Sequence, residues 1–389
     1  MSVKVDPNLM KDLKAFGLKD ATQCFHCGNC TGICPLATSE NPFPRKLVQY
    51  AQLGLKDKIV ESPEPWLCYY CGDCSDACPR GADPGEAMMA MRRYLTSLYD
   101  WTGFSRRFYV SEKFEILAVA VVGLLVGLAL LLFRASNPNM EHAHLNSVWP
   151  AESMEIADMI MGGTLAILLL SNTFRCFLFQ MGDLKNKIPF TYYIKEIKTL
   201  IIHFLTQRRL RDCSDPYRMP WIIHFLIMTG YSTILLLVVI FLAGGIDLIG
   251  LSWEKIRFQR DEIYAIYHPV RLLGYYGTFA ILYGTTYAII GRIKKQKARY
   301  KNSHGTDWMF LILIELATLT GIFIHFARLL DLAMATYVIY VIHLMVAVPM
   351  LVLEVPFAKW AHLAYRPVTI FLTNVKKRYL EEQQTATAG

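Results

Sequence analysis

Apolar and polar positions divide this 389-residue chain into two unequal parts. The first hundred residues are polar, whereas the remainder alternates long apolar runs with basic loops. At about 1.5 Å per residue, a run of roughly 20 residues crosses the hydrocarbon core of a bilayer. The pattern therefore predicts six membrane helices, near residues 114–133, 156–179, 221–246, 269–291, 308–330 and 337–358.

The second of these segments is the weakest candidate, because Asp158 and Arg175 shorten its uncharged interior. Its flanks nevertheless indicate its direction. The preceding loop, 135–153, has no lysine or arginine, whereas the segment that follows, 185–218, is strongly basic. Since lysine and arginine collect in cytoplasmic loops, the end of this helix is predicted to face the cytoplasm.

Basic residues also predict the direction of the whole bundle. Four arginines before the first helix, the loop 292–301 and the tail 376–378 fall on one side if the chain crosses six times. The loop 247–267 is a mild exception, because four acidic residues accompany its three basic ones. Both termini are therefore expected on the cytoplasmic side of a bacterial or archaeal inner membrane. This topology also accounts for the net charge of +8, so nucleic-acid binding has little support.

Composition agrees with a membrane protein, since 54% of the residues are hydrophobic and the mean hydropathy is +0.30. Short helices are expected at 45–54 and 86–99, and an amphipathic helix on the inner leaflet at 192–210. The expected fold class is all-α. A cytoplasmic domain would span residues 1–105, a transmembrane domain 106–370 and a cytoplasmic tail 371–389.

Eight of the ten cysteines form two runs with one spacing, C-x2-C-x2-C-x3-C-P. Thiolates at this spacing wrap 4Fe-4S clusters, and the fourth cysteine of each run usually binds the other cluster. Zinc sites and disulfides are the alternatives, but zinc sites use paired C-x2-C elements, and no secretory signal precedes these clustered thiols. We therefore expect two 4Fe-4S clusters, one held by Cys24, Cys27, Cys30 and Cys78 and the other by Cys68, Cys71, Cys74 and Cys34. Outside the runs, Cys176 lies in an apolar stretch and is expected to be a small buried residue.

Histidines in the apolar segments are candidate haem ligands, because polar residues at membrane depth are functional candidates by default. His343 and His362 are nineteen residues apart, roughly 28 Å along an ideal helix, so they suit two b haems stacked across the membrane. Pro349 and Pro356 between them can bend the segment. The alternative for any single membrane histidine is a hydrogen bond to a neighbouring helix.

The residues 343–362, which end V-P-F-A-K-W-A-H-L-A-Y-R-P, resemble the last helix of the respiratory nitrate reductase gamma subunit and of the membrane subunit of heterodisulfide reductase. The stretch P-W-I-I-H-F around His224 is similar to the helix of those families that binds the cytoplasmic haem. The resemblance implies an inner haem b between His224 and His362. For the outer haem b it implies His343 with His268, from the segment H-P-V-R-L-L-G, and His325 is the rival. The nitrate reductase pattern fails here, because Leu237 stands where its second histidine would fall.

The amino-terminal third resembles the C subunit of soluble heterodisulfide reductase, so the chain looks like a fusion of that protein with its membrane counterpart. Such a fusion is characteristic of the quinone-interacting membrane-bound oxidoreductases (Qmo) of sulfate reducers. The resemblance implies a dicluster ferredoxin domain followed by a six-helix cytochrome b domain. It also implies electron exchange between menaquinone and two cytoplasmic flavin-containing Qmo-like subunits, which serve adenylylsulfate reductase in sulfate respiration.

Charged residues near the membrane segments are candidates for a quinone site or a proton path, namely Arg271, Arg328 and Glu315, with Asp331 and Glu354 as further possibilities. The chain has no C-C-G motif, no G-x-G-x-x-G opening a strand-helix unit and no P-loop, so disulfide and nucleotide chemistry are expected elsewhere. The alternatives are a haem-free membrane anchor that carries a ferredoxin domain, and the membrane arm of an electron-bifurcating complex. In each case the chain is a subunit of an oxidoreductase.

Overall fold

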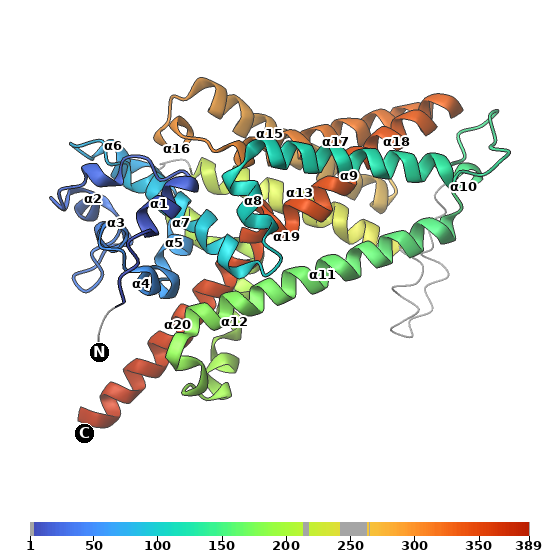
Figure 1. Ribbon diagram of the computed structural model, residues 1–389. Helices are drawn as coiled ribbons and strands as arrows, with labels where there is room; N and C mark the ends of the chain where they lie inside the picture. The colour runs from blue at the N-terminus through green and yellow to red at the C-terminus, as the bar shows by residue number, and fades with distance from the viewer. Residues whose placement is uncertain (1–3, 213–217, 242–262, 264, 389) are drawn as a thin grey trace.

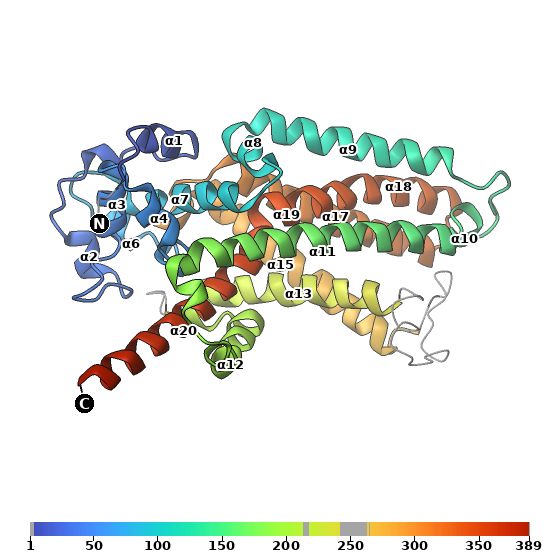
Figure 2. The ribbon, with the colours of Figure 1, turned by 60° about the horizontal axis from the view of Figure 1, so that its bottom comes forward.

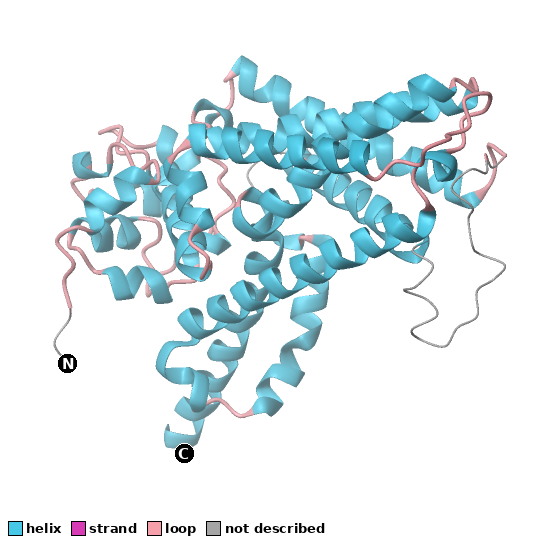
Figure 3. Cartoon of the chain, turned by 45° about the vertical axis from the view of Figure 1, so that its right-hand side comes forward, coloured by secondary structure: helices cyan, strands magenta, loops and turns pink. Residues whose placement is uncertain are grey.

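The computed structural model describes every residue except 1–3, 213–217, 242–262, 264 and 389. Helices joined by short loops make up the described residues, and no strand occurs among them (Figure 3). The predicted all-α fold class is therefore confirmed for the described part of the chain. The predicted third membrane segment extends beyond residue 241, and its end lies outside the described residues.

The amino-terminal region is a compact group of short helices at one end of the molecule (Figure 1). Its core contains the fully buried Leu13, Leu47, Met88 and Tyr94. The predicted helices 45–54 and 86–99 are confirmed as α3 and α7. The helices of this region are α1 (Leu9–Ala15), α2 (Asn29–Ile33), α3 (Arg45–Gln52), α4 (Lys56–Glu61), α5 (Glu64–Leu67), α6 (Asp73–Asp76) and α7 (Pro84–Tyr99).

Long apolar helices extend away from this group and lie lengthwise beside one another (Figure 2). Short α8 (Phe104–Val110) leads into the first of them, α9, whose amide of Phe114 is capped by the side chain of Ser111. The other elements are α10 (Leu145–Val148), α11 (Ala151–Met181), α12 (Phe190–Thr206), α13 (Met219–Phe241), α15 (Pro269–Lys294), α16 (Ala298–Lys301), α17 (Gly305–Leu329), α18 (Ala333–Pro349), α19 (Val355–Phe357) and α20 (His362–Ala388), with α9 at Glu112–Leu132.

Among the described residues, five helices are long and apolar enough to cross a membrane, and they correspond to five of the six predicted segments. The remaining predicted segment, at 269–291, is present as the 26-residue helix α15, but this helix is not among the five that are apolar enough to cross a membrane. Its four glycines and four tyrosines lower its hydropathy. A six-helix membrane domain therefore stays a prediction at this one helix.

Glycines let α15 pack very closely against α13. A Cβ atom on Gly230 would lie 2.8 Å from the carbonyl oxygen of Gly277, and one on Gly277 would lie 2.9 Å from the side chain of Ile234. Small residues at such crossings let two membrane helices approach until their backbones touch. The side of α15 that looks weakly apolar in sequence is thus a packing surface.

The last predicted membrane helix is broken near its inner end. The α-helix α18 stops at Pro349, a π-helical turn follows at Met350–Glu354, and α19 ends at Phe357, before Ala358, whose backbone is not helical. The chain restarts at His362 as α20, which continues through the segment predicted as a separate tail. His343 and His362 therefore lie on two different helices, as bending at the two prolines would produce.

Tight contacts attach the amino-terminal region to the bundle. Arg175 of α11 donates hydrogen bonds to the carbonyl oxygens of Leu98 and Tyr99, where α7 ends. Tyr99 stacks edge-on against Tyr365 of α20 with ring centres 5.1 Å apart. Cys176 is completely buried in this cluster, as predicted for it. The charged Arg175 is thus explained by its partners at the end of α7.

We expect Gly230→Ala to destabilise the protein, because the new methyl group meets backbone atoms of α15 that cannot move without separating the two helices. Overpacking of this kind costs about 1–3 kcal/mol. The measurement is the thermal unfolding midpoint of the detergent-solubilised protein. Gly162→Ala on α11 is the matched control, because nothing lies within 4 Å of its added Cβ atom. Equal midpoints for the two variants would contradict the close α13–α15 contact.

Candidate functional site

The two cysteine runs fold into the same local structure. His26 and Tyr70, each two residues after the first cysteine of its run, have positive φ angles of 57° and 55°. The glycines after the second cysteines, Gly28 and Gly72, have φ angles of 92° and 93°. These left-handed turns aim backbone N–H groups at sulfur, at 3.4 Å from His26 to Cys24 and 3.3 Å from Tyr70 to Cys68. Such hydrogen bonds tune the reduction potential of a bound cluster.

Each run contributes its fourth cysteine to the cavity of the other run. One cavity, of about 330 Å³, is lined by the first cysteine set, Cys24, Cys27, Cys30 and Cys78. A second cavity, of about 410 Å³, is lined by the second cysteine set, Cys34, Cys68, Cys71 and Cys74. The structure thus brings together the two groups of four that the sequence predicts. Among the described residues, no three His, Cys, Asp or Glu side chains converge closely enough to hold a single metal ion.

The two sets differ in their exposure. Cys27 of the first set is exposed, whereas Cys68 and Cys74 of the second set are buried. Burial raises the pKa of the Cys34 thiol to about 11 and raises the pKa of Cys68 as well. The described cysteines form no disulfide. Binding to iron requires thiolates, so these thiols lose their protons when a cluster is bound.

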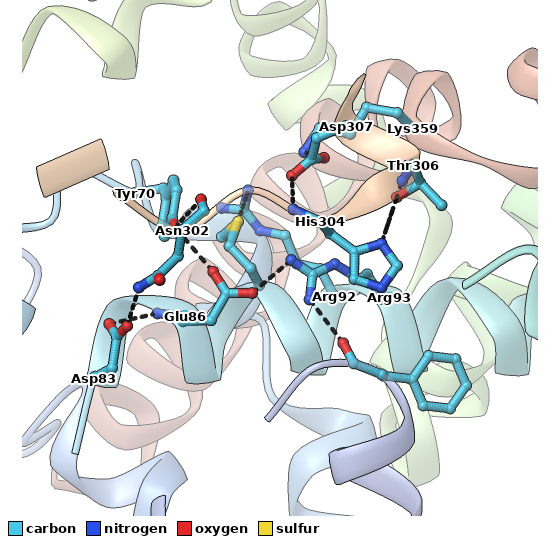
Figure 4. Close-up of polar contacts among 12 residues, drawn as sticks. Tyr70, Asp83, Glu86, Arg92, Arg93, Asn302, His304, Thr306, Asp307 and Lys359 are labelled. Atoms are coloured by element: carbon cyan, nitrogen blue, oxygen red, sulfur yellow. Dashed lines mark hydrogen bonds and ion pairs between the residues drawn. The ribbon is translucent and has the colours of Figure 1, made fainter. Parts of the chain in front are cut away.

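A polar network joins the second run to the loop before α17 (Figure 4). Glu86 lies at its centre, where it accepts a 2.9 Å hydrogen bond from the hydroxyl of Tyr70 and pairs with Arg93 at 2.7 Å. The same tyrosine hydroxyl lies 3.1 Å from the carbonyl oxygen of Asn302, and the amide of Asn302 donates to Asp83. Polar side chains of the cysteine region, those of Tyr70 and Asp83, are therefore hydrogen-bonded to Asn302 in the membrane half.

Two arginines from different halves of the chain meet at one carbonyl oxygen. Arg92 of α7 donates to the backbone oxygen of Cys68, and Arg366 of α20 donates to the same oxygen at 3.2 Å. The guanidinium group of Arg366 also lies 5.6 Å from the ring centre of Tyr69. Burial and the neighbouring charge of Arg366 lower the pKa of Arg92 to about 9. Sequence reasoning missed both residues, although Arg366 lies one helical turn after His362.

His224 of α13 and His362 at the start of α20 lie edge to face, with ring centres 5.9 Å apart and ring planes at 82°. The Nδ1 atom of His362 donates to the carbonyl oxygen of Lys359, which leaves Nε2 with a lone pair. Nδ1 of His224 is buried without a hydrogen-bond partner among the described residues. Both rings line a cavity of about 770 Å³, here termed the junction cavity, together with Tyr69, Tyr70, Arg92, Lys359 and Arg366.

His343 is oriented by Thr320 on α17. The hydroxyl of Thr320 donates to the carbonyl oxygen of Leu316 at 2.8 Å, so it accepts the 2.9 Å hydrogen bond from Nδ1 of His343. Nε2 of His343 is therefore the nitrogen with a lone pair. Gly321 lies beside the imidazole ring of His343, since a Cβ atom built on Gly321 would lie 3.7 Å from Cε1 of His343.

The two predicted partners of His343 lie in different surroundings. His268 is the residue that precedes α15, and His325 lies on α17. Arg271 donates to the hydroxyl of Tyr275 at 2.6 Å, and that hydroxyl lies 3.0 Å from Nε2 of His325. The ring contacts of the described residues join His325 to Tyr275 rather than to His343.

Three glutamates among the described residues lie inside the bundle. Two of them, Glu315 and Glu354, are candidates from the sequence, and the third is Glu115. Glu315 accepts hydrogen bonds from Thr285 and, at 2.7 Å, from Thr286 on α15. Glu354, in the π-helical turn, is completely buried beside Glu115 of α9, which sequence reasoning missed because it lies at the polar start of its helix.

At the opposite end of the bundle, Asp331 binds the side chain of His142 at 2.6 Å and accepts from the amide of Ala143 at 2.7 Å. These contacts attach the loop between α9 and α10 to the turn after α17. Asp331 therefore has a local structural role. Arg328, another predicted candidate, lies one turn before it on α17.

The cysteine region matches known proteins. A family described as a 4Fe-4S dicluster domain matches residues 20–82. The chain is 35% identical over 97 residues to a protein of Archaeoglobus profundus that is described as like the C subunit of heterodisulfide reductase, a match that covers 25% of this chain and 52% of the relative. It is 37% identical over 63 residues to the C subunit of the H(2):CoB-CoM heterodisulfide,ferredoxin reductase of Methanothermobacter thermautotrophicus, covering 16% and 34% of the two chains. No solved structure matches.

These matches and the fold define an iron–sulfur electron-transfer protein with a helical membrane part. Its cysteine region is similar to the C subunits of heterodisulfide reductases, which are multi-subunit oxidoreductases. The chain spans between a third and a half of the length of the curated relatives described above. The membrane half lies outside the matched residues, so its cofactors and substrates are matters for proposal.

His304 makes stability depend on pH. Its Nδ1 accepts the amide hydrogen of Thr306 and so caps α17, which requires a neutral ring. Burial, followed by the charge of Arg93, lowers the pKa of His304 from 6.5 to about 4. A lowered folded-state pKa means that the cap contributes fully above pH 6.5 and is lost as pH falls from about 6.5 to about 4.

We therefore expect His304→Asn, which keeps a cap without a titrating ring, to flatten the loss of stability between pH 6.5 and 4. The effect is at most about 3 kcal/mol. The measurement is the unfolding midpoint across this pH range, with the exposed-loop variant His144→Asn as control. If the unfolding midpoint of His304→Asn falls with pH as steeply as that of the wild-type protein, the His304 cap is not the cause of the pH dependence.

Proposed function

We propose that this chain is a membrane electron-transfer subunit that relays electrons between menaquinol and cytoplasmic partner subunits through two b haems and two 4Fe-4S clusters. The observation that carries the proposal is the junction cavity, where His224 and His362 lie beside the backbone of the second cysteine run. A haem site and a cluster site that share one cavity wall are suited to exchange single electrons. The alternative of a haem-free membrane anchor does not explain why two histidines lie together in this cavity.

For the clusters, we assign one to each of the two cysteine sets defined above. The lining of the two cavities supports this assignment, because each contains three cysteines of one run and the fourth of the other. Positive-φ turns and the N–H groups aimed at sulfur suit thiolate ligands. When bound, the clusters supply one-electron chemistry, and the residues around them position them and set their potentials.

For the inner haem we assign His224 and His362. Their ring centres lie 5.9 Å apart and both rings line the junction cavity, so both imidazoles would be available to one haem iron. The bond from His362 to the carbonyl of Lys359 fixes the ring as metal-binding histidines usually are fixed. Arg92 and Lys359 in the cavity wall can bind carboxylates of the haem edge.

For the outer haem we assign His343, whose ring is held by Thr320 with Nε2 available. His268 is the proposed second ligand, because the Tyr275 hydroxyl already engages Nε2 of His325. His325 remains the rival, since loss of that hydrogen bond would release its nitrogen. In either case a haem held by two histidines would supply electron transfer rather than substrate binding at iron.

We place the quinone site near the outer end of α15 and α17, on the analogy with related membrane subunits. Oxidation of menaquinol releases two electrons and two protons, so a hydrogen-bonding site must accept protons. The hydrogen-bonded series Arg271–Tyr275–His325 offers such groups, and Arg328 lies one turn after His325. Glu315, held by two threonines deeper in the bundle, is a candidate for carrying protons.

The partners follow from the resemblance to heterodisulfide reductases, whose C subunits belong to multi-subunit complexes. We propose two cytoplasmic flavin-containing Qmo-like partner subunits, through which electrons reach adenylylsulfate reductase in sulfate respiration. The chain would lie in the cytoplasmic membrane with the cysteine region and α20 on the cytoplasmic side. Figure 1 is consistent with this arrangement, since α1 and the last turns of α20 lie toward the same end of the molecule.

We expect the purified chain to show two b haems in its reduced-minus-oxidised visible spectrum and His362→Ala to retain one. The haem lost should be the one assigned to His224 and His362, because these two side chains together would hold it. The spectrum and an iron count, taken after a menaquinol analogue and again after dithionite, measure this. His144→Ala, in an exposed loop, is the control and should retain both haems.

Iron–sulfur absorption without haem bands in the wild-type protein would exclude the relay. It would leave the membrane anchor with a ferredoxin domain. Haem bands that a menaquinol analogue cannot reduce would instead favour the membrane arm of a bifurcating complex with another donor.

A further inference from the structure

Among the described residues, the hydrogen bonds from the membrane half to the two cysteine runs reach the second run. Arg366, Asn302 and Lys301 of the membrane half bind Cys68, Tyr70 and Asp76, all in the second run. The first run has a different environment. Its Cys27 is exposed, and beside it Phe25 is 68% exposed beneath the guanidinium group of Arg80.

The helices agree with this asymmetry. In Figure 1, α2, which carries Cys30, lies at the end of the molecule away from the long helices. In contrast, α5 ends one residue before Cys68 and packs directly against α20. The second cysteine set thus lies between the first set and the histidine pair.

We propose that the site of the second cysteine set exchanges electrons with the membrane half, and that Arg92 and Arg366 are the positioning residues that join them. This inference rests on the proposed function and adds the order of the sites along the chain. A haem held by His224 and His362 would give up one electron and a cluster held by the second cysteine set would gain it, with no proton transferred. The first set then passes the electron to a partner.

Arg366 is suited to this role by its place on α20. It follows His362 by four residues, so the two side chains lie on one face of the helix. Its guanidinium group donates to the carbonyl of Cys68 while stacking over Tyr69. One short helical segment therefore binds both sites and sets the distance between them.

Charge gives these arginines a second effect. A cluster bound to four thiolates carries net negative charge, and its reduction potential depends on nearby charge and hydrogen bonds. Two guanidinium groups on the carbonyl of Cys68 stabilise the reduced form of a cluster at the second set. At the first set, Arg45 donates to a carbonyl oxygen of the first cysteine loop, that of His26, at 3.4 Å.

The test is an EPR-monitored redox titration of the full-length, detergent-solubilised protein. We expect Arg366→Gln to shift the potential of one cluster signal to more negative values and Arg45→Gln to shift only the other signal. Arg366→Lys keeps the charge and should restore most of the shift. The two glutamine variants are matched, since each removes one guanidinium group from a carbonyl of one cysteine loop.

The order is measured by spin relaxation in the same samples. An oxidised haem is paramagnetic and speeds the relaxation of a nearby cluster spin. We expect the signal that Arg366→Gln shifts to relax more slowly in His362→Ala, which lacks the inner haem, and the other signal to change less. If the signal shifted by Arg45→Gln shows the larger change, or if neither signal changes, the proposed order is wrong.

These outcomes are separable from failure of the proposed function. Absence of haem bands in the wild-type protein would sink the function itself. Two haems with the reversed relaxation pattern would leave the relay intact and overturn only the order and the role of the arginines.

Discussion

The buried ion pair between Arg93 and Glu86 is the contact on which the position of the iron–sulfur region depends. Its charged atoms lie 2.7 Å apart within α7, almost completely removed from solvent. Removing one partner of such a pair leaves an uncompensated buried charge, so both residues are needed together. Arg93 also binds the carbonyl of Phe16, and Glu86 binds Tyr70. The amino-terminal helix, the second cysteine loop and the loop before α17 are therefore held by one pair of charges.

A second constraint acts where the last membrane helix is interrupted. A continuous helix from His343 to His362 would place both imidazoles on one rigid rod. The π-helical turn and the non-helical Ala358 separate the rod into two parts, so that α20 starts at His362 in a new direction. Interruptions of this kind are frequent at functional sites. The break lets α20 contact the amino-terminal region while α18 stays with the membrane helices.

The membrane half shows why hydropathy and packing can disagree. The glycines and tyrosines of α15 reduce its apolar character, yet the same glycines allow backbone contact with α13. Two of its threonines donate hydrogen bonds to the carboxylate of Glu315. A helix that donates hydrogen bonds to a buried carboxylate and packs through glycines is stabilised by its neighbouring helices, so its surface does not have to be apolar throughout.

The sequence by itself determined the features that depend on local spacing. Four cysteines within eleven residues, a proline after each run and apolar runs of membrane length are local patterns, and they predicted the dicluster region and five of the membrane helices. It also predicted short α3 and α7 and the burial of Cys176. Only the tertiary structure decided which distant groups meet. The joining of Arg92 and Arg366 at Cys68, the pairing of Glu115 with Glu354 and the hydrogen bond between Tyr275 and His325 all depend on the way helices cross. Such contacts follow from the packing of side chains around irregular turns, which local periodicity does not encode.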